Sequence, residues 1–255
     1  MATRVGCIGA RTGSQSSCAQ GNGAPVGGIW ETCLVSRTWI VIPMYNEASV
    51  VGGVISGLRE VFPFVVCVDD GSTDGSQQAA REAGAVVIQH PVNLGQGASL
   101  QTGIEYALND PELDCIVTFD ADGQHRVVDA QAMAERIKSG EAEVVLGSRF
   151  LDDRTKMSLA KRTVLRTAAI QSRMSTGMAL TDAHNGLRAF SPQVACKIHL
   201  TQNRMAHASE LIHQLSEIKP RWVEQPVEII YTDYSKAKGQ SLLNSVNILA
   251  DLLFR

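Results

Sequence analysis

The sequence predicts an α/β protein built around one open, mostly parallel sheet with helices on both faces. Short apolar runs alternate with stretches in which apolar residues recur at helical spacing. The links between them are short, which favours parallel strands joined by crossover helices. Polar clusters follow the apolar runs at their carboxyl ends, where folds of this kind bind ligands. We therefore expect a ligand site along that edge of the sheet.

The composition is that of an ordinary globular protein. The chain has 255 residues, of which 44% are hydrophobic, and a formal net charge of -3, so it can bury a full core and gives no indication of nucleic-acid binding. The 6 cysteines form no C-x-x-C pair, which favours reduced thiols over disulfides or zinc. No apolar run reaches the length of a transmembrane helix. Residues 1–36, rich in Gly, Ser, Ala and Thr, are interpreted as a flexible extension.

The segment 38–89 is expected to form three strands separated by two helices. Its first run is apolar throughout, as in a strand buried on both faces, and Pro43 is expected to end it. Its second strand closes in the acidic turn 69–75, because Asp and Gly favour tight turns. The full assignment is strands at 38–43, 64–68 and 85–89 and helices at 48–60 and 76–83.

The segment 98–146 continues the alternation. Helices are expected at 98–108 and 127–138, and strands at 115–117 and 142–146, the last followed by Gly147-Ser148-Arg149. No Gly-x-Gly-x-x-Gly follows the first strand, and no P-loop pattern occurs. A dinucleotide-binding Rossmann domain and a P-loop nucleotidase are therefore not expected.

The turn after the run 115–117 carries the strongest sign of chemistry. Asp120 and Asp122 are two residues apart, so on extended backbone their carboxylates project to the same side and repel unless a cation or a proton lies between them. Oxygen-only ligands suit Mg²⁺ or Mn²⁺, and Gln124 can add a neutral oxygen. A solvated turn rich in aspartate is the alternative interpretation of an Asp-x-Asp pair.

Beyond Arg149 the pattern changes. Residues 154–181 contain six basic residues, no acidic residue and a partial apolar stripe, which indicates an amphipathic basic helix or helix pair. A solvated surface helix is equally compatible with this charge. The remaining expected elements are a turn into a short strand over 181–190, a helix beginning at Pro192, a helix at 208–217, a strand at 223–231 and an apolar tail at 236–255. The tail either meets a membrane surface or packs on the sheet or on a second subunit.

Six short motifs occur between Trp39 and Tyr231. They are Ile42-Pro43-Met44-Tyr45-Asn46-Glu47, Val68-Asp69-Asp70-Gly71-Ser72-Thr73-Asp74, Asn93-Leu94-Gly95-Gln96-Gly97, Asp120-Ala121-Asp122-Gly123-Gln124-His125, Gly147-Ser148-Arg149-Phe150 and Asp182 through Arg188. In this order and spacing they resemble the family-2 glycosyltransferases. Among these, the chain is similar to the polyprenyl-phosphate glycosyltransferases, typified by dolichyl-phosphate mannosyltransferase.

This resemblance implies a GT-A fold over residues 37–235, with 236–255 as an amphipathic tail, and a nucleotide-diphosphate sugar as donor. Asp70 would face the base, since a carboxylate can accept from the ring N–H of uracil or guanine. The residues implied to bind the donor are Pro43, Tyr45, Glu47, Val68, Asp70, Gln96, Asp120, Ala121, Arg149 and Arg188. The implied ligands of Mg²⁺ or Mn²⁺ are Asp120, Asp122 and Gln124, and the implied catalytic residues are Asp182, as candidate base, and Asp122.

The sequence departs from the family pattern at three places. Arg126 stands where the family has proline, and Leu187 replaces the phenylalanine of Gly-Phe-Arg. The segment Tyr231-Thr232-Asp233-Tyr234-Ser235-Lys236 lacks the arginine that the family places after the tyrosine, which leaves Lys236 or Lys238 as substitutes to bind the acceptor phosphate.

The resemblance implies a metal-dependent, inverting hexosyltransferase that uses a polyprenyl phosphate as acceptor at the cytoplasmic membrane face, where the protein would be peripheral. A lipid phosphate is already an anion, so Asp182 would orient the acceptor or the sugar and not act as a strong base. Two other classes stay open: a soluble family-2 enzyme acting on a saccharide or small hydroxyl acceptor, and a non-catalytic nucleotide-sugar-binding protein. Nucleic acid is not an expected partner, and a homo-oligomer is left open.

Overall fold

The computed structural model describes residues 36–152, 154–155, 157–203 and 206–231. The predicted tail and all but the last residue of the predicted N-terminal extension therefore lie outside the described residues. The described elements are β1 (Thr38–Met44), α1 (Val51–Arg59), β2 (Phe64–Asp69), α2 (Ser76–Glu82), β3 (Val86–Gln89), α3 (Gln96–Ala107), β4 (Cys115–Thr118), α4 (Val127–Lys138), β5 (Val144–Ser148), α5 (Leu159–Thr176), β6 (Arg188–Phe190), α6 (Pro192–Ala195), α7 (His207–Ile218) and β7 (Trp222–Pro226).

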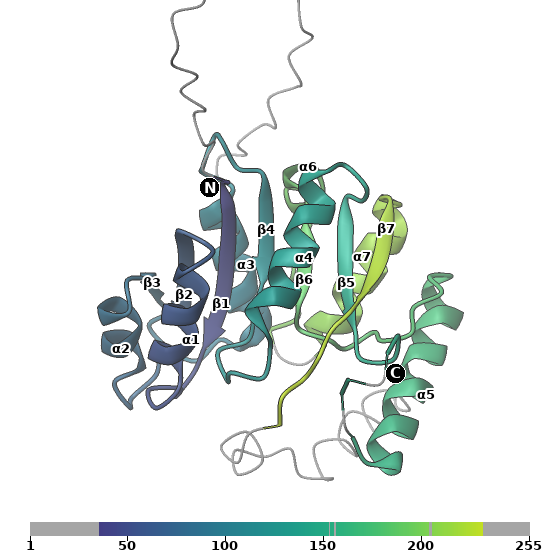
Figure 1. Ribbon diagram of the computed structural model, residues 1–255, viewed down its shortest axis with the longest axis horizontal. Helices are drawn as coiled ribbons and strands as arrows, with labels where there is room; N and C mark the ends of the chain where they lie inside the picture. Colours follow the sequence, from purple (N-terminus) through teal and green to yellow (C-terminus); the bar gives the residue numbers. More distant parts are fainter. Residues whose placement is uncertain (1–35, 153, 156, 204–205, 232–255) are drawn as a thin grey trace, which may run out of the picture. The chain divides into compact units, whose positions relative to one another are not determined.

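The strands form one sheet in the order β3-β2-β1-β4-β6-β5-β7 (Figure 1). In its centre, Trp39 of β1 lies opposite Phe64 of β2 and Ile116 of β4, all in parallel register. Strand β6 runs antiparallel to both of its neighbours, β4 and β5. The expectation of a mostly parallel sheet is thus confirmed, and the short strand expected within 181–190 is the one that reverses direction.

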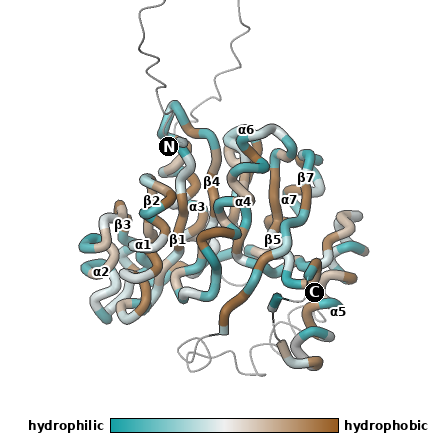
Figure 2. Tube along the Cα trace, viewed as in Figure 1, coloured by the Kyte–Doolittle hydropathy of each residue, from teal (hydrophilic) through white to brown (hydrophobic). Residues whose placement is uncertain are grey.

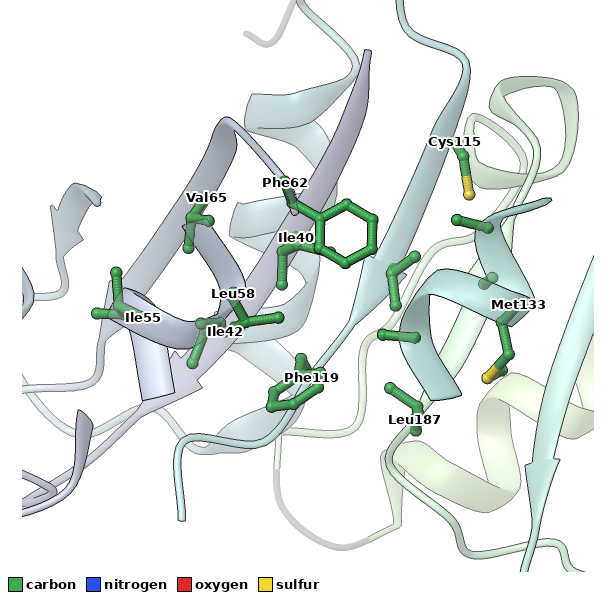
Figure 3. Packing of buried hydrophobic residues seen from close by; sticks show 14 of the residues in the cluster. Ile40, Ile42, Ile55, Leu58, Phe62, Val65, Cys115, Phe119, Met133 and Leu187 are labelled. Carbon is green, nitrogen blue, oxygen red and sulfur yellow. The ribbon is translucent and has the colours of Figure 1, made fainter. Parts of the chain in front are cut away.

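One face of the sheet is covered by α1, α2 and α4. Ile40 and Ile42 of β1 belong to the same buried cluster as Ile55 and Leu58 of α1 and Met133 of α4 (Figure 3). These side chains are fully or almost fully buried, and each one removed from water contributes about 1.5–3 kcal/mol. This layer fixes the first strand, whose carboxyl end carries the Pro43 motif.

The opposite face is covered by α3, α6 and α7. Val41 and Val66 pack in a second cluster with Leu100 and Ile104 of α3 and Leu211 of α7. The strands are therefore apolar on both faces, and the brown, hydrophobic segments of Figure 2 include β4 and β5. This explains why the strand sequences are continuous apolar runs and do not alternate.

Strands β1 and β5 end later in the chain than predicted. Strand β1 continues past Pro43 to Met44, so the expectation that Pro43 ends it was wrong. The register of β1 with β4 stops at Val41, so the missing N–H of Pro43 breaks no ladder bond on that side. Strand β5 reaches Ser148 because β7 lies alongside it as far as Pro226.

Two other boundaries differ from the prediction. Strand β7 ends at Pro226, and residues 227–231 leave the sheet to contact neighbouring loops, as described below. Helix α1 begins at Val51 and not at Ala48, because residues 48–50 form turns on the carbonyl of Glu47.

The basic segment 154–181 contains a single helix, α5, which contacts α7. Ala168 of α5 is buried, whereas Leu159, Ile170 and Met174 are 81%, 61% and 83% exposed. No helix within the described ranges is long and apolar enough to cross a membrane.

Candidate active site

A cavity of about 460 Å³ opens at the carboxyl ends of β1, β2 and β4, beside the start of α3. Its size is within the range of small-molecule sites. The residues that line it are Pro43, Met44, Tyr45, Glu47, Asp70, Asn93, Gly95, Gln96, Ser99, Asp120, Ala121 and Asp122. The structure therefore brings together most of the predicted donor-binding residues at the predicted edge of the sheet. Val68, Arg149 and Arg188 are not among the lining residues, and the side chain of Val68 is fully buried.

Asp70 lies at one end of the cavity and is held by the loop before α3. Its Oδ1 accepts from the N–H of Leu94 at 2.9 Å, and its Oδ2 accepts from the N–H of Gly95 at 2.7 Å. Gly95 has φ +101°, a conformation that side chains rarely adopt, so glycine is what allows the loop to aim this N–H at Asp70. Asp70 is only 3% exposed and still lines the cavity.

The Asp-x-Asp pair lies at the opposite end of this lining. His125 Nε2 is 3.0 Å from Asp120 Oδ2, and Gln96 Nε2 donates to Asp120 Oδ1 at 3.2 Å. Desolvation works against ionisation of Asp120, but the hydrogen bond from His125 and the nearby positive groups hold its pKa below the ordinary value. Burial and the adjacent Asp120 carboxylate raise the pKa of Asp122 to about 6. The two carboxylates thus repel each other, as the sequence predicted.

Gln124 is tied to this pair. Its Nε2 donates to Asp122 Oδ2 at 2.5 Å, and its N–H donates to Asp122 Oδ1 at 3.0 Å. Its role as a metal ligand stays a prediction.

Arg188 begins β6 and lies beside the acidic pair. It is 3% exposed, and its guanidinium makes no hydrogen bond or ion pair with any residue that the structure describes. Burial lowers the pKa of Arg188 to about 10, which the charges of Asp120 and Asp182 only partly offset. A buried cation of this kind requires an anion as partner. The planar guanidinium presents parallel N–H donors, which suit the oxygens of a phosphate.

Arg149 and Asp182 form a buried ion pair at the end of β5. Arg149 Nε and Nη2 donate to Oδ2 and Oδ1 of Asp182 at 2.6 and 2.7 Å, and the Arg149 N–H adds a longer bond. Burial favours the neutral acid, yet the Arg149 guanidinium holds the pKa of Asp182 below its usual value. Asp182 is therefore a weak base here, and Arg149 already has a carboxylate partner.

The segment after β7 crosses the site. The N–H of Ile230 donates to the carbonyl of Gln124 at 2.9 Å, and Val227 donates to Ser148 at 3.0 Å. Arg126, which stands where the family has proline, pairs with Glu228 of this segment at 2.7 Å. This departure from the family pattern thus has a structural role. Lys236 and Lys238 lie outside the described residues.

Two residues of the site escaped the sequence analysis. His90, at the end of β3, contacts Asp70, and a side chain at Gly186 would meet Asp120 Oδ2 at 2.3 Å. His90 could have been found because it follows a strand, as the other site residues do. The contact of Gly186 has no sequence signal beyond the Asp182–Arg188 motif. Leu187, where the family has phenylalanine, is fully buried in the core.

Comparison with known proteins agrees with this geometry. Residues 39–195 match the glycosyl transferase family 2. An uncharacterized protein of Methanocaldococcus jannaschii is 33% identical over 85% of this chain and 91% of that protein. The UDP-N-acetylglucosamine–dolichyl-phosphate N-acetylglucosaminyltransferase of Methanococcus voltae is 29% identical over 84% of this chain and 94% of its own. The crystal structure of glucosyl-3-phosphoglycerate synthase from Mycobacterium tuberculosis in complex with Mg²⁺ and uridine-diphosphate has a TM-score of 0.64 at 17% identity, covering 85% and 78% of the two chains.

The mixed sheet, its cavity and the Asp-x-Asp turn define a glycosyltransferase of the GT-A fold. The chain belongs to glycosyl transferase family 2.

Proposed function

We propose that this protein is a metal-dependent, inverting hexosyltransferase that moves a sugar from a nucleotide-diphosphate donor to a polyprenyl phosphate at the cytoplasmic face of a membrane. The observation that carries the proposal is the arrangement of charge around Asp120. Asp120 and Asp122 repel each other, and the buried guanidinium of Arg188, which lies near Asp120, makes no ion pair with any described residue. A donor diphosphate with its metal ion supplies a cation for the carboxylates and an anion for the guanidinium.

The acidic pair fits Mg²⁺ or Mn²⁺. No group of three or more His, Cys, Asp or Glu side chains with metal-site geometry occurs in the part of the chain that the structure describes. Mg²⁺ usually takes one or two carboxylates together with waters and substrate phosphates, so Asp120 and Asp122 are a sufficient protein contribution. Burial and, after it, the Asp120 carboxylate raise the pKa of Asp122, and a cation between the two carboxylates would remove the second of these effects. When bound, the metal neutralises the charge that develops on the leaving nucleoside diphosphate.

The chain's own residues then orient the donor. In this proposal Asp70 faces the base, Glu47 and Tyr45 line the cavity that holds the donor, and Arg188, which lies near Asp120, binds a phosphate oxygen. A single displacement at the anomeric carbon by the acceptor oxygen inverts its configuration. Asp120 and Asp122 would hold the metal, and Arg188 would hold a phosphate oxygen of the leaving diphosphate as the bond breaks.

The state of Asp182 supports a phosphate acceptor. A hydroxyl acceptor benefits from a general base, worth about 10²–10⁴-fold, and the paired Asp182 is poorly suited to that task. A phosphate acceptor is already anionic and needs no such base. The curated relative from Methanococcus voltae is named for transfer onto a dolichyl phosphate, which is an acceptor of this chemistry.

The exposed face of α5 supports contact with a membrane. At 100° per residue, Leu159, Ile170 and Met174 share one side of the helix with Arg162, Arg166 and Arg173, within about 120° of one another. A face that is apolar and basic at once suits an anionic lipid surface. Asp182 follows shortly after this helix, so a lipid headgroup bound at α5 would lie near the acceptor side of the site.

The test is transfer of sugar from a panel of UDP- and GDP-sugars, with Mn²⁺, to undecaprenyl or dolichyl phosphate in phosphatidylglycerol vesicles. We expect a lipid-linked sugar with one donor and none with free saccharides. Transfer to a soluble saccharide or hydroxyl acceptor in the absence of lipid would contradict the lipid acceptor and support a soluble one. Absence of turnover with every donor would contradict the proposal that the protein is an enzyme.

A further inference from the structure

His90 is a buried histidine whose two ring nitrogens are both engaged. Nδ1 lies 2.9 Å from Asp70 Oδ1, and Nε2 lies 3.0 Å from the hydroxyl of Thr102 on α3. The residue is 7% exposed, and its N–H donates to the carbonyl of Asp69 on the neighbouring strand at 2.8 Å. The imidazole therefore bridges the hydroxyl of Thr102 on α3 and the carboxylate of Asp70, which lines the cavity.

The chemistry of the two partners fixes the ring. An ionised Asp70 only accepts hydrogen bonds, so Nδ1 of His90 carries a hydrogen and donates it. The Thr102 hydroxyl can donate or accept, so it holds Nε2 in either protonation state of the ring. The ring cannot rotate without losing a hydrogen bond in a buried place, which costs about 1–3 kcal/mol.

Three donors use three of the acceptor positions of Asp70. Oδ1 accepts from His90 and from the N–H of Leu94, and Oδ2 accepts from the N–H of Gly95. A carboxylate has about four such positions. The remaining acceptor position is on Oδ2, and Asp70 lines the cavity. Oδ2 can therefore accept a hydrogen bond from one ring N–H of a base.

His90 also anchors the loop that supplies the other two donors. Residues 91–95 run from His90 to the start of α3, and Thr102 lies in that helix. Loss of the His90 bridge would free one position on Oδ1 and loosen the loop that holds Leu94 and Gly95. The carboxylate could then tilt and offer its oxygens in more than one direction.

We propose that His90, held by Thr102, is a positioning residue that fixes Asp70 so that it selects donors whose base carries a ring N–H. Uracil and guanine have such a group at the pairing edge, whereas cytosine and adenine have only an acceptor at the equivalent ring nitrogen. This inference rests on the proposed binding of a nucleotide sugar, and it adds a residue that governs which base is accepted.

Two pairs of substitutions separate positioning from packing. In His90→Asn, the amide nitrogen takes the place of Nδ1 and can still donate to Asp70, whereas in His90→Gln the amide reaches the place of Nε2 and leaves Asp70 without that donor. Thr102→Ser keeps the hydroxyl that holds the ring, and Thr102→Val removes it at nearly constant volume. Thermal unfolding of each variant checks that it is folded, and the Thr102 pair serves if a His90 variant is not.

The readout is calorimetric binding of UDP, GDP, CDP, ADP and inorganic diphosphate with Mn²⁺. The wild type should bind UDP or GDP at least about tenfold more tightly than CDP and ADP, because a site built for a donor rejects a base that lacks it. The quantity compared is the affinity for UDP or GDP divided by the affinity for CDP or ADP. We expect His90→Gln and Thr102→Val to reduce this ratio about fivefold or more. His90→Asn and Thr102→Ser should keep it within about twofold of the wild-type value. The affinity for inorganic diphosphate should not change in any variant.

Four results would overturn the proposal, in distinguishable ways. Wild-type protein that binds no nucleoside diphosphate would refute the proposed function and this inference with it. Wild-type binding without base preference would remove Asp70 as the reader of the base. A preference that survives in His90→Gln and Thr102→Val would leave the function intact and refute the positioning role. An equal loss of nucleotide and inorganic diphosphate affinity would show that His90 only maintains the general structure of the site.

Discussion

Arg149 and Asp182 form a two-bond ion pair in which the side chains are 10% and 1% exposed. The pair joins the end of β5 to the turn that leads into β6, where the sequence analysis placed a phosphate-binding arginine and a candidate base. Each of these two groups is the principal partner of the other. The two groups therefore neutralise each other, whereas the guanidinium of Arg188 makes no ion pair with any residue that the structure describes.

Replacement of Asp182 by asparagine should destabilise the protein by about 3–5 kcal/mol, because it leaves Arg149 as a buried charge without its partner. The pKa of Asp182 is lowered in the folded state, so its contribution is complete above the unfolded pKa of about 3.9 and is lost as pH falls through the folded value. Urea unfolding should show a constant deficit from about pH 5 to 8 and a smaller one below about pH 4.

The matched control for this change is Glu141→Gln, which removes the carboxylate of an exposed pair with Arg136 and should barely move the unfolding midpoint. An Asp182→Asn protein as stable as the wild type at pH 7 would contradict the buried pair.

Replacement of Asp122 by asparagine should remove most turnover and leave the unfolding midpoint nearly unchanged, because the residue lies in a polar turn outside the core. The physical reason is the loss of one of the two carboxylates proposed to hold the metal. Turnover with Mn²⁺, followed by titration with a chelator, measures this.

Asp114→Asn is the control, since Asp114 precedes the same strand, β4, at its other end, away from the cavity lining. It should keep full activity. Wild-type activity that persists in excess chelator would rule out the metal requirement.

Replacement of Asp70 by alanine should weaken nucleoside diphosphate binding at least about tenfold, because it removes the acceptor that faces the base and leaves the N–H groups of Leu94 and Gly95 without their partner. The turnover number at saturating donor should change much less. Calorimetry and steady-state kinetics separate the two quantities, and an unchanged donor affinity would remove Asp70 from the site.

Replacement of Gly186 by alanine should reduce turnover at least about tenfold, because the new methyl group would meet Asp120 Oδ2 and push the carboxylate out of place. The paired control is Gly53→Ala in α1, where no atom lies within 4 Å of the added carbon. That change should stabilise the protein by about 0.5–1 kcal/mol and leave turnover unchanged. Normal metal-dependent turnover in Gly186→Ala would show that this close approach is unimportant.

Replacement of Arg162, Arg166 and Arg173 by glutamine should weaken binding to anionic vesicles, since each basic residue near such a surface contributes about 1 kcal/mol. Sedimentation with phosphatidylglycerol and phosphatidylcholine vesicles, at low and high salt, measures this. Wild-type binding should prefer the anionic vesicles and weaken with salt.

The control is the triple variant Arg81→Gln, Lys197→Gln and Lys219→Gln, which removes the same number of positive charges. These three residues are exposed and lie outside α5. It should bind vesicles like the wild type. Protein that stays in the supernatant with anionic vesicles at low salt would favour the soluble acceptor.

The sequence by itself determined the class of fold and the edge that carries the site. Continuous apolar runs such as 38–43 specify strands buried on both faces, and a parallel sheet gathers their carboxyl ends at one edge. That pattern predicts that Asp70, Asp120 and Asp122 lie at one edge of the sheet, and all three line the cavity there. The six motifs indicated the glycosyltransferase family, and the comparison with known proteins confirmed it.

Only the tertiary structure decided which groups are paired. Arg149 contacts Asp182 across 33 positions of sequence and His90 contacts Asp70 across 20 positions, and neither distance is encoded in a local pattern. The direction of β6 was also undetermined, because a run of three residues has no periodicity that distinguishes parallel from antiparallel pairing. Local sequence sets which residues face the core and which follow a strand. The partner of a buried charge depends on how distant segments pack, because only packing excludes water and makes one particular partner necessary.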